Sequence, residues 1–185
     1  MPHAVAWLLA ALIVAAGPAG AFQASGELPA TGVVRYAFSP GGEAAELIID
    51  TVGSARSEIY VQAFIVTHRE IAAALIAAAA RGLRVELIAD QAQFDSVPQS
   101  AIPMLSGGGV TVYLDAEHAA AHDKVILVDP RSDQPAVVTG SFNLTWSAQH
   151  RNAENVLVLW GNQGLAQAYL ENWLRHQAHA VRYNP

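Results

Sequence analysis

Apolar residues follow two different spacings along this chain, one typical of strands and one typical of helices. Residues 33–38 and 59–66 are short runs rich in apolar and β-branched residues, which predicts strands. After residue 43, Ala45, Ile48, Ile49 and Val52 recur at helical spacing. A second helix is predicted from residue 68, with Thr67 at its N-cap and Glu70 three residues later. Further strands are predicted at 85–89, 110–114, 125–128, 136–139 and 155–160.

The order of these elements predicts an α/β fold. Strands alternate with helices in the first half, which implies right-handed crossovers and parallel pairing. Residues 92–109 are rich in proline and glycine and are predicted to form a loop with at most one short helix. The second half is richer in strands, and a last helix carries Leu165, Tyr169 and Trp173 on its core side. We therefore expect a mixed, largely parallel sheet with helices on both faces, in one domain spanning residues 32–185.

Composition narrows the class of protein. The chain has 185 residues, 52% hydrophobic and 14% charged, which suits a single globular domain. Its formal net charge is −6, so any nucleic-acid binding requires a local basic patch. The absence of cysteine from the sequence excludes disulfides, thiol catalysis and cysteine-bound zinc.

The N-terminal residues predict export. Residues 4–16 form an apolar run that is shorter than the roughly 20 residues of a membrane-spanning helix. The small residues Ala19-Gly20-Ala21 follow, in the pattern of a secretory cleavage site, although no lysine or arginine precedes the run. We expect a signal peptide at residues 1–21, a linker at 22–31, and a periplasmic or secreted protein.

Lysine occurs once in the sequence, as Lys124, two residues after His122. Positions i and i+2 of a strand face the same side, so the two side chains are predicted to share one pocket. On this local pattern alone, a surface lysine next to an incidental histidine explains the sequence better than a shared pocket does.

Three short motifs change that balance. His122-Asp123-Lys124 begins a run that ends at Asp129, then come Gly140-Ser141-Phe142-Asn143 and Asn152-Ala153-Glu154-Asn155. The set resembles the HxKxxxxD signature of the phospholipase D superfamily with its GSxN element and downstream acidic residue. Residues 33–180 are similar to the small bacterial endonucleases of that superfamily, the Nuc-like type with one motif per chain. The ten residues between Asp129 and Gly140 exceed the usual gap, which predicts an extended hairpin loop.

The resemblance implies roles for these residues. His122 attacks phosphorus to form a phosphohistidine, and a second histidine protonates the leaving oxygen. With one motif per chain, a homodimer must supply the second His122. Lys124 and Asn143 bind the phosphoryl oxygens with help from Ser141, and Glu154 orients His122. Asp129 is interpreted as structural, and no cofactor or metal is required.

Alternatives remain open at this point. His118 and His122 are four residues apart and would share a helix face as zinc ligands, but the glutamate of a zincin is absent. His68, His150, His176 and His179 are interpreted as surface residues. Arg35 and Arg151 are candidates for binding substrate. The leading function is a nuclease acting on DNA or RNA; the alternatives are a phospholipid-cleaving phospholipase D and a non-catalytic binding module, which the complete motif set disfavours.

Overall fold

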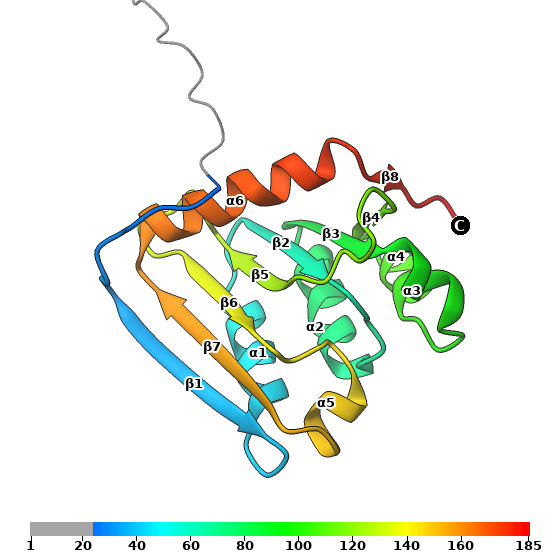
Figure 1. The fold of residues 1–185 in the computed structure, drawn as a ribbon, viewed down its shortest axis with the longest axis horizontal. Coiled ribbons are helices and arrows are strands. Elements are labelled where there is room, and N and C mark those ends of the chain that lie inside the picture. The colour runs from blue at the N-terminus through cyan, green and yellow to red at the C-terminus, as the bar shows by residue number, and fades with distance from the viewer. Residues whose placement is uncertain (1–23) are drawn as a thin grey trace, which may run out of the picture.

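The computed structural model describes residues 24–185 of the chain, and Figure 1 shows its elements. The signal peptide predicted at residues 1–21 lies outside this part. In chain order the elements are β1 (Val33–Ser39), α1 (Ala44–Gly53), β2 (Glu58–Ala63), α2 (Arg69–Ala80), β3 (Arg84–Asp90), α3 (Gln91–Ser96), α4 (Ile102–Gly107), β4 (Thr111–Asp115), β5 (Lys124–Val128), β6 (Ala136–Gly140), α5 (Trp146–His150), β7 (Glu154–Trp160), α6 (Gln163–Gln177) and β8 (Val181–Arg182).

The strands of the described residues form one eight-stranded sheet in the order β1-β7-β6-β5-β2-β3-β4-β8. The predicted mixed sheet with helices on both faces is confirmed, but its parallel part is smaller than predicted. Among the strand pairs of residues 24–185, only β2–β3 and β3–β4 are parallel. The reason is that helical crossovers connect only these neighbours, whereas later strands reverse direction. β1 does not join β2; it pairs antiparallel with β7 at the sheet edge.

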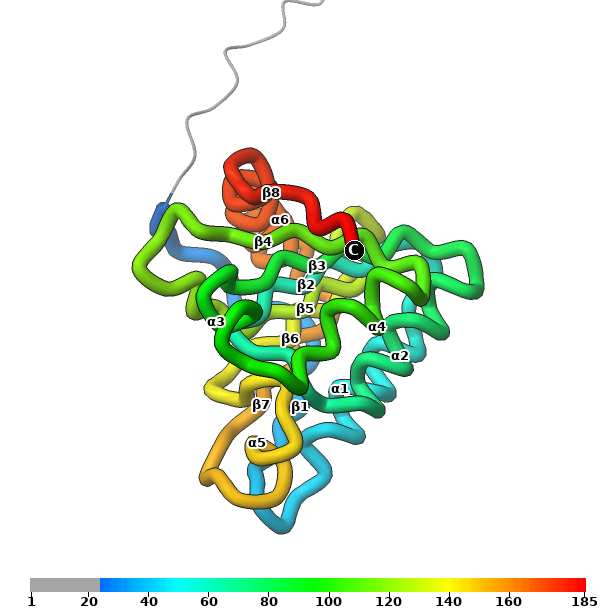
Figure 2. Tube along the Cα trace, turned by 90° about the vertical axis from the view of Figure 1, so that its right-hand side faces the viewer, coloured from blue at the N-terminus to red at the C-terminus, as the bar shows by residue number. Residues whose placement is uncertain are grey.

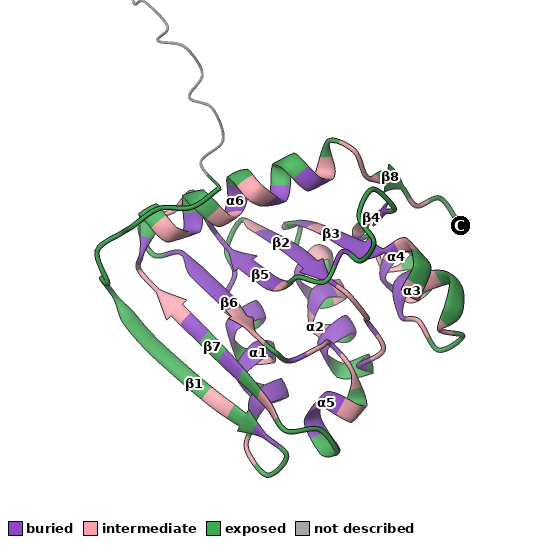
Figure 3. Ribbon diagram, viewed as in Figure 1, coloured by how far each residue is buried: buried purple, intermediate pink, exposed green. Residues whose placement is uncertain are grey.

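Helices cover the two faces unequally. α1 and α2 pack on one face through fully buried residues such as Ile48 and Leu75, as Figure 2 shows from the side. α6 crosses the opposite face and inserts Trp173 against Tyr60 at 4.8 Å between ring centroids. The indole N–H of Trp173 donates to the Val61 carbonyl at 2.8 Å. Figure 3 shows that the outer strand β1 is mostly exposed.

Several boundaries differ from the predicted ones. β2 ends at Ala63 instead of residue 66, and α2 has His68 as its N-cap in place of Thr67. The His68 imidazole accepts from the Ile71 amide, which explains why the helix starts one residue later. Two short helices, α3 and α4, occupy the predicted loop, and α5 and β8 were not predicted. Within residues 24–185, none of the helices is long and apolar enough to span a membrane.

Candidate active site

The histidine–lysine motif lies at the start of β5, between β2 and β6 in the middle of the sheet. Lys124 is the first residue of β5, and its Nζ lies 3.1 Å from His122 Nδ1. The same ammonium donates to the His122 carbonyl oxygen at 2.6 Å. The two side chains therefore meet, although His122 precedes the regular strand on which the prediction relied.

The loop that carries His122 is held by Asp90 at the end of β3. Asp90 is buried, and its Oδ2 accepts from the Ala121 amide at 2.8 Å. Its Oδ1 accepts from the Gln93 amide and caps α3. No motif in the sequence points to Asp90, although a polar group at the carboxyl end of a parallel strand is a recognised position for site residues.

Phe64 forms an apolar wall beside the motif. Its ring centroid lies 4.4 Å from that of His122 and 5.2 Å from Lys124 Nζ. Burial lowers the pKa of Lys124, while the charges of Asp123 and Glu154 act in the opposite direction, and the net pKa is below the ordinary value. The ammonium is thus partly desolvated, which strengthens its interaction with a bound anion.

The facing wall is built where β6 ends. Gly140 has a φ of 149°, and a β-carbon there would overlap the Asn155 carbonyl oxygen, so glycine is required. Ser141 follows and donates to Glu154 Oε2 at 2.5 Å, while Asn152 Nδ2 donates to Oε1 at 3.0 Å. In the described residues Glu154 is therefore bonded to Ser141 and Asn152, and its orienting role toward His122 stays a prediction.

Asn143 contributes a side-chain amide to the same site. Its Oδ1 is buried and has no hydrogen-bond partner among the described residues. A buried polar atom without a partner costs about 1–3 kcal/mol. This oxygen can only accept a hydrogen bond, so an anion in the pocket would be bound by the Nδ2 donor of the same amide.

These motifs line one open pocket of about 400 Å³. The structure thus brings together all five predicted catalytic residues: His122, Lys124, Ser141, Asn143 and Glu154. The remaining lining residues are Asp123, Val125, Thr139, Gly140 and Tyr169.

Tyr169 has a second role besides the core packing that the sequence predicts for it and Trp173. Trp173 is fully buried, and Tyr169 packs against the same core cluster. Tyr169 lies one turn earlier on α6, is only half-buried, and reaches the pocket. Helical spacing identified the correct face of α6, but could not show that this face extends past the core to the site.

The two arginines proposed for substrate binding do not line the pocket. Arg35 is exposed on β1 and lines a different open hollow together with Glu43, Glu46 and Asp50. Arg151 follows α5, and its guanidinium lies 5.2 Å from the Trp146 ring centroid. Lys124 is the one cation among the pocket-lining residues, alongside the acidic Asp123 and Glu154.

Asp129 lies at the far end of β5, away from the pocket. Its Oδ2 accepts from the Arg56 amide, and its Oδ1 accepts from the Ser57 amide and hydroxyl and from the Glu58 amide, at 2.7–2.9 Å. Burial raises the pKa of this carboxyl, but these hydrogen bonds outweigh burial and hold it below its ordinary value. The contacts fix the start of β2 against the end of β5.

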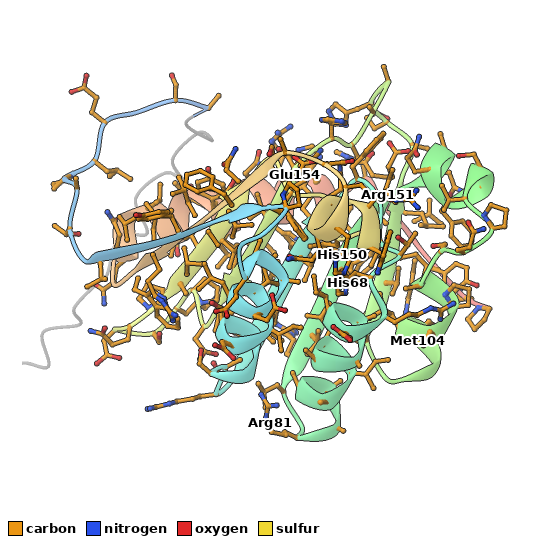
Figure 4. All side chains as sticks on the ribbon, turned by 90° about the horizontal axis from the view of Figure 1, so that it is seen from below. His68, Arg81, Met104, His150, Arg151 and Glu154 are labelled. Atoms are coloured by element: carbon orange, nitrogen blue, oxygen red, sulfur yellow. The ribbon has the colours of Figure 1, made fainter. Side chains whose placement is uncertain are left out.

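Two histidines interpreted as surface residues are in fact buried. His68 caps α2, and Figure 4 shows it next to His150 below the sheet. Burial lowers the pKa of His68, with Glu70 opposing and His150 adding to the effect. His176 lies in the last turn of α6 and has 6% of its surface exposed. Isolated histidines give no sequence signal for burial, because their partners are distant in the chain.

The fold and the pocket, with its histidine–lysine pair, point to the class of phosphodiester hydrolases. Residues 48–176 match the family described as Cardiolipin synthase, PLD-like domain. Phospholipase D from Rickettsia bellii (strain RML369-C) is 37% identical over 145 residues, which cover 78% of this chain and 69% of the relative. The crystal structure of Nuc, a phospholipase D family member from Salmonella typhimurium, superposes with a TM-score of 0.77 at 31% identity. That match covers 84% of this chain and all of Nuc.

NucT from Helicobacter pylori shares the fold, with a TM-score of 0.70 at 22% identity over 82% of this chain and all of NucT. The chain belongs to the phospholipase D superfamily, and it is a phosphodiester hydrolase with one histidine–lysine motif.

Proposed function

We propose that this protein is a metal-independent endonuclease that hydrolyses DNA or RNA through a phosphohistidine intermediate, in an active site built by two copies of the chain. The observation that carries the proposal is the contact between His122 and Lys124 in a pocket that also contains Ser141, Asn143 and Glu154. The extent of the match to Nuc, which covers the whole of that chain, supports a compact enzyme of the same type.

The chemistry divides between two imidazoles. His122 of one copy attacks phosphorus, and His122 of the second copy protonates the leaving oxygen. The phosphohistidine bond then breaks when the second imidazole takes a proton from the attacking water. Lys124 and the amide of Asn143 are placed to bind the non-bridging oxygens, whose negative charge grows in the transition state.

Attack through Nε2 requires a proton on Nδ1. In the present arrangement His122 Nδ1 faces the Lys124 ammonium. A neutral ring accepts a hydrogen bond from this ammonium at Nδ1 and therefore carries its proton on Nε2. We infer that substrate draws Lys124 toward the phosphate. The ring then loses its Nε2 proton to water and gains one from water on Nδ1, and Nδ1–H donates to Glu154. Glu154 is close enough to Lys124 for its charge to raise the pKa of that lysine.

A row of side chains that runs from the exposed edge strand to the pocket supports the dimer. Tyr36, Leu157, Thr139 and Val125 occupy one register row across β1, β7, β6 and β5, so they face the same side of the sheet. Tyr36 is 67% exposed at one end of this row, and Val125 and Thr139 line the pocket at the other. A second copy seated on this row would lie beside His122.

A negative charge introduced into that row tests the dimer. Tyr36→Asp is expected to give a folded monomer that has lost its activity, because the second His122 is absent. Val33→Asp is the matched control, since Val33 is equally exposed on the opposite face of β1. Light scattering gives the mass and circular dichroism the fold. A fully active wild-type monomer would contradict the shared site.

Phospholipid is the second candidate substrate, favoured by two observations. The relative from Rickettsia bellii is named Phospholipase D, and the pocket has one cation against two carboxylates, which is a weak attractor for a polyanion. Parallel assays at low salt on plasmid DNA, single-stranded RNA and phosphatidylcholine vesicles decide between them. Turnover of the vesicles alone would replace the nuclease proposal with the lipase.

Variants in the motif test the chemistry common to both substrates. On bis(p-nitrophenyl) phosphate, His122→Ala is expected to lower turnover about 10,000-fold, as loss of a nucleophile does. Lys124→Ala is expected to lower it about 100- to 1,000-fold through lost charge stabilisation. His150→Ala, an exposed histidine outside the pocket, is the control. Near wild-type turnover by His122→Ala would defeat the assignment.

Two further parts of the proposal need separate tests. Activity in excess EDTA, at a temperature where circular dichroism shows a folded chain, tests metal independence; its loss from folded protein would indicate a metal enzyme. Export to the periplasm or beyond rests on residues 1–21 alone. A mature N-terminus near residue 22 in the exported fraction would support it, and an intact N-terminus in the cytoplasmic fraction would refute it.

A further inference from the structure

Three histidines converge on one buried carboxylate at the other side of the loop that carries His122. His176 Nδ1 and His179 Nε2 each lie 3.1 Å from Asp115 Oδ2, and His118 Nδ1 lies 3.6 Å from the same oxygen. One nitrogen from each ring and this oxygen all lie within 4.8 Å of one another. We propose that Asp115, His118, His176 and His179 bind a zinc ion, at a site that is separate from the catalytic pocket.

Hydrogen bonding explains only part of this arrangement. Neutral imidazoles of His176 and His179 can each donate one N–H to Asp115 Oδ2, which uses both lone pairs of that oxygen. The separation of 3.6 Å to His118 is too long for a third hydrogen bond. The approach of the third ring nitrogen to an oxygen that is already satisfied is instead what a shared cation would produce.

The three distances from Asp115 Oδ2 are close to those of four-coordinate zinc, and ligand atoms that lie up to 4.8 Å apart would move closer together on binding. Ligand atoms bonded at about 2.0–2.1 Å in a tetrahedron lie about 3.3 Å from one another. The three contacts to Asp115 Oδ2, at 3.1, 3.1 and 3.6 Å, bracket this value. The pairs of histidine rings, with centroids 4.9–5.4 Å apart, surround the oxygen without stacking. Three imidazoles and a carboxylate are also a donor set that suits zinc.

The surroundings hold the donors in place. Asp115 is fully buried, and its Oδ1 accepts from the Glu117 amide at 2.9 Å, which leaves Oδ2 directed at the rings. One contact of His176 would change on binding, because Arg175 Nη2 lies 3.2 Å from His176 Nε2. A metal on Nδ1 leaves the ring proton on Nε2, which then faces another donor, so Arg175 would move away from His176. The hydrogen bond from Arg175 Nη2 to Asn172 Oδ1, 2.8 Å long, would remain.

The site would connect parts of the chain that are distant in sequence. Asp115 ends β4, His118 lies in the loop leading to β5, and His176 and His179 lie at the end of α6. The loop between β4 and β5 is then held at two places, by zinc at His118 and by Asp90 at Ala121. The ion would therefore support the fold and the approach to His122, and it shares no residue with the catalytic pocket.

Metal content of the full chain, purified without a histidine tag, tests the proposal. After incubation with ZnCl₂ and dialysis against metal-free buffer, elemental analysis is expected to find one zinc per chain. His118→Ala and His179→Ala remove partly exposed rings, so they are expected to fold and to lose most of this zinc. His150→Ala is the control, an exposed histidine outside the cluster that should retain it.

Two further readouts are independent of catalysis. Cobalt(II) is expected to give the visible d–d bands of a four-coordinate ion in wild type and to lose them in His118→Ala. Zinc at about 100 times its dissociation constant is expected to raise the melting temperature of wild type by about 5–10 °C. The proposal is overturned if wild type binds no zinc after dialysis, or if His118→Ala and His179→Ala retain as much zinc as His150→Ala.

Discussion

The carboxylate of Asp129 provides the sharpest test of how this fold is held together. It accepts hydrogen bonds from three backbone amides and one hydroxyl in residues 56–58, and it is itself buried. Asp129 also has a φ of 47°, a left-handed conformation that aspartate and asparagine tolerate better than most residues. Asp129→Asn therefore keeps the backbone conformation and the size of the side chain. Asp129→Ala loses both carboxylate oxygens that accept hydrogen bonds, and alanine tolerates the left-handed conformation less well.

The magnitudes follow from the bonds lost. In Asp129→Asn the new amide group faces the Arg56 N–H donor, so one amide loses its acceptor and the other bonds lose their charge. One such unpaired group costs about 1–3 kcal/mol, and we expect a loss of about 2 kcal/mol. In Asp129→Ala three amides lose their acceptor together, and we expect about 4 kcal/mol. At about 2–4 °C per kcal/mol, melting temperatures should fall by about 4–8 °C and 8–16 °C.

Urea unfolding followed by tryptophan fluorescence measures these losses, since Trp173 is buried in the native state. Asp133→Asn, an exposed aspartate in the same loop, is the control. Because the folded pKa of Asp129 lies below its ordinary value, its contribution is present above about pH 4 and is lost as the pH falls through the folded pKa. The gap between wild type and Asp129→Asn should narrow in acid. A loss below 1 kcal/mol for Asp129→Ala, or a gap independent of pH, would refute this account.

Three other variants probe the site. Gly140→Ala should lower the melting temperature by several degrees or prevent folding, because its β-carbon overlaps the Asn155 carbonyl; unchanged melting would contradict the required glycine. Ser141→Ala should cost about 1 kcal/mol in urea unfolding and alter the pH profile of turnover, since Glu154 loses a hydrogen-bond donor. Tyr169→Ala should raise KM for single-stranded nucleic acid about 5- to 150-fold, the effect of losing one stacked base, with little change on bis(p-nitrophenyl) phosphate. Equal effects on both substrates would exclude stacking.

Much of the fold follows from local sequence patterns. The buried strand β2 and the amphipathic helix α1 have periods that depend only on neighbouring residues, and both were predicted within a few positions. Pairing between distant strands has no such local signal. β1 was therefore expected in a largely parallel sheet, whereas its seven residues pair antiparallel with β7. The short elements α5 and β8 depend on tertiary contacts and lack a clear period.

The site residues that belong to sequence motifs could be predicted. Those that only the tertiary structure brings to the site could not. His122, Lys124 and Asn143 were identified from their spacing, and the structure places them in one pocket. Asp90 and Tyr169 reach that region from other elements, so no spacing in the sequence connects them to it. The cluster around Asp115 could not be predicted for the same reason. The sequence suggests His118 and His122 as a pair of metal ligands, whereas the other histidines near His118 lie some sixty residues later.

Helix α6 links three regions that would otherwise respond separately to mutation. Within four residues it contributes one side chain to the pocket, Tyr169, and one to the interior, Trp173, and its final turn reaches the cluster around Asp115. A helix moves as a rigid rod, so a repacking change beneath Trp173 would be transmitted to Tyr169. Mutations in the interior should therefore change the substrate preference of this protein. Directed evolution that mutates only the pocket residues would overlook them.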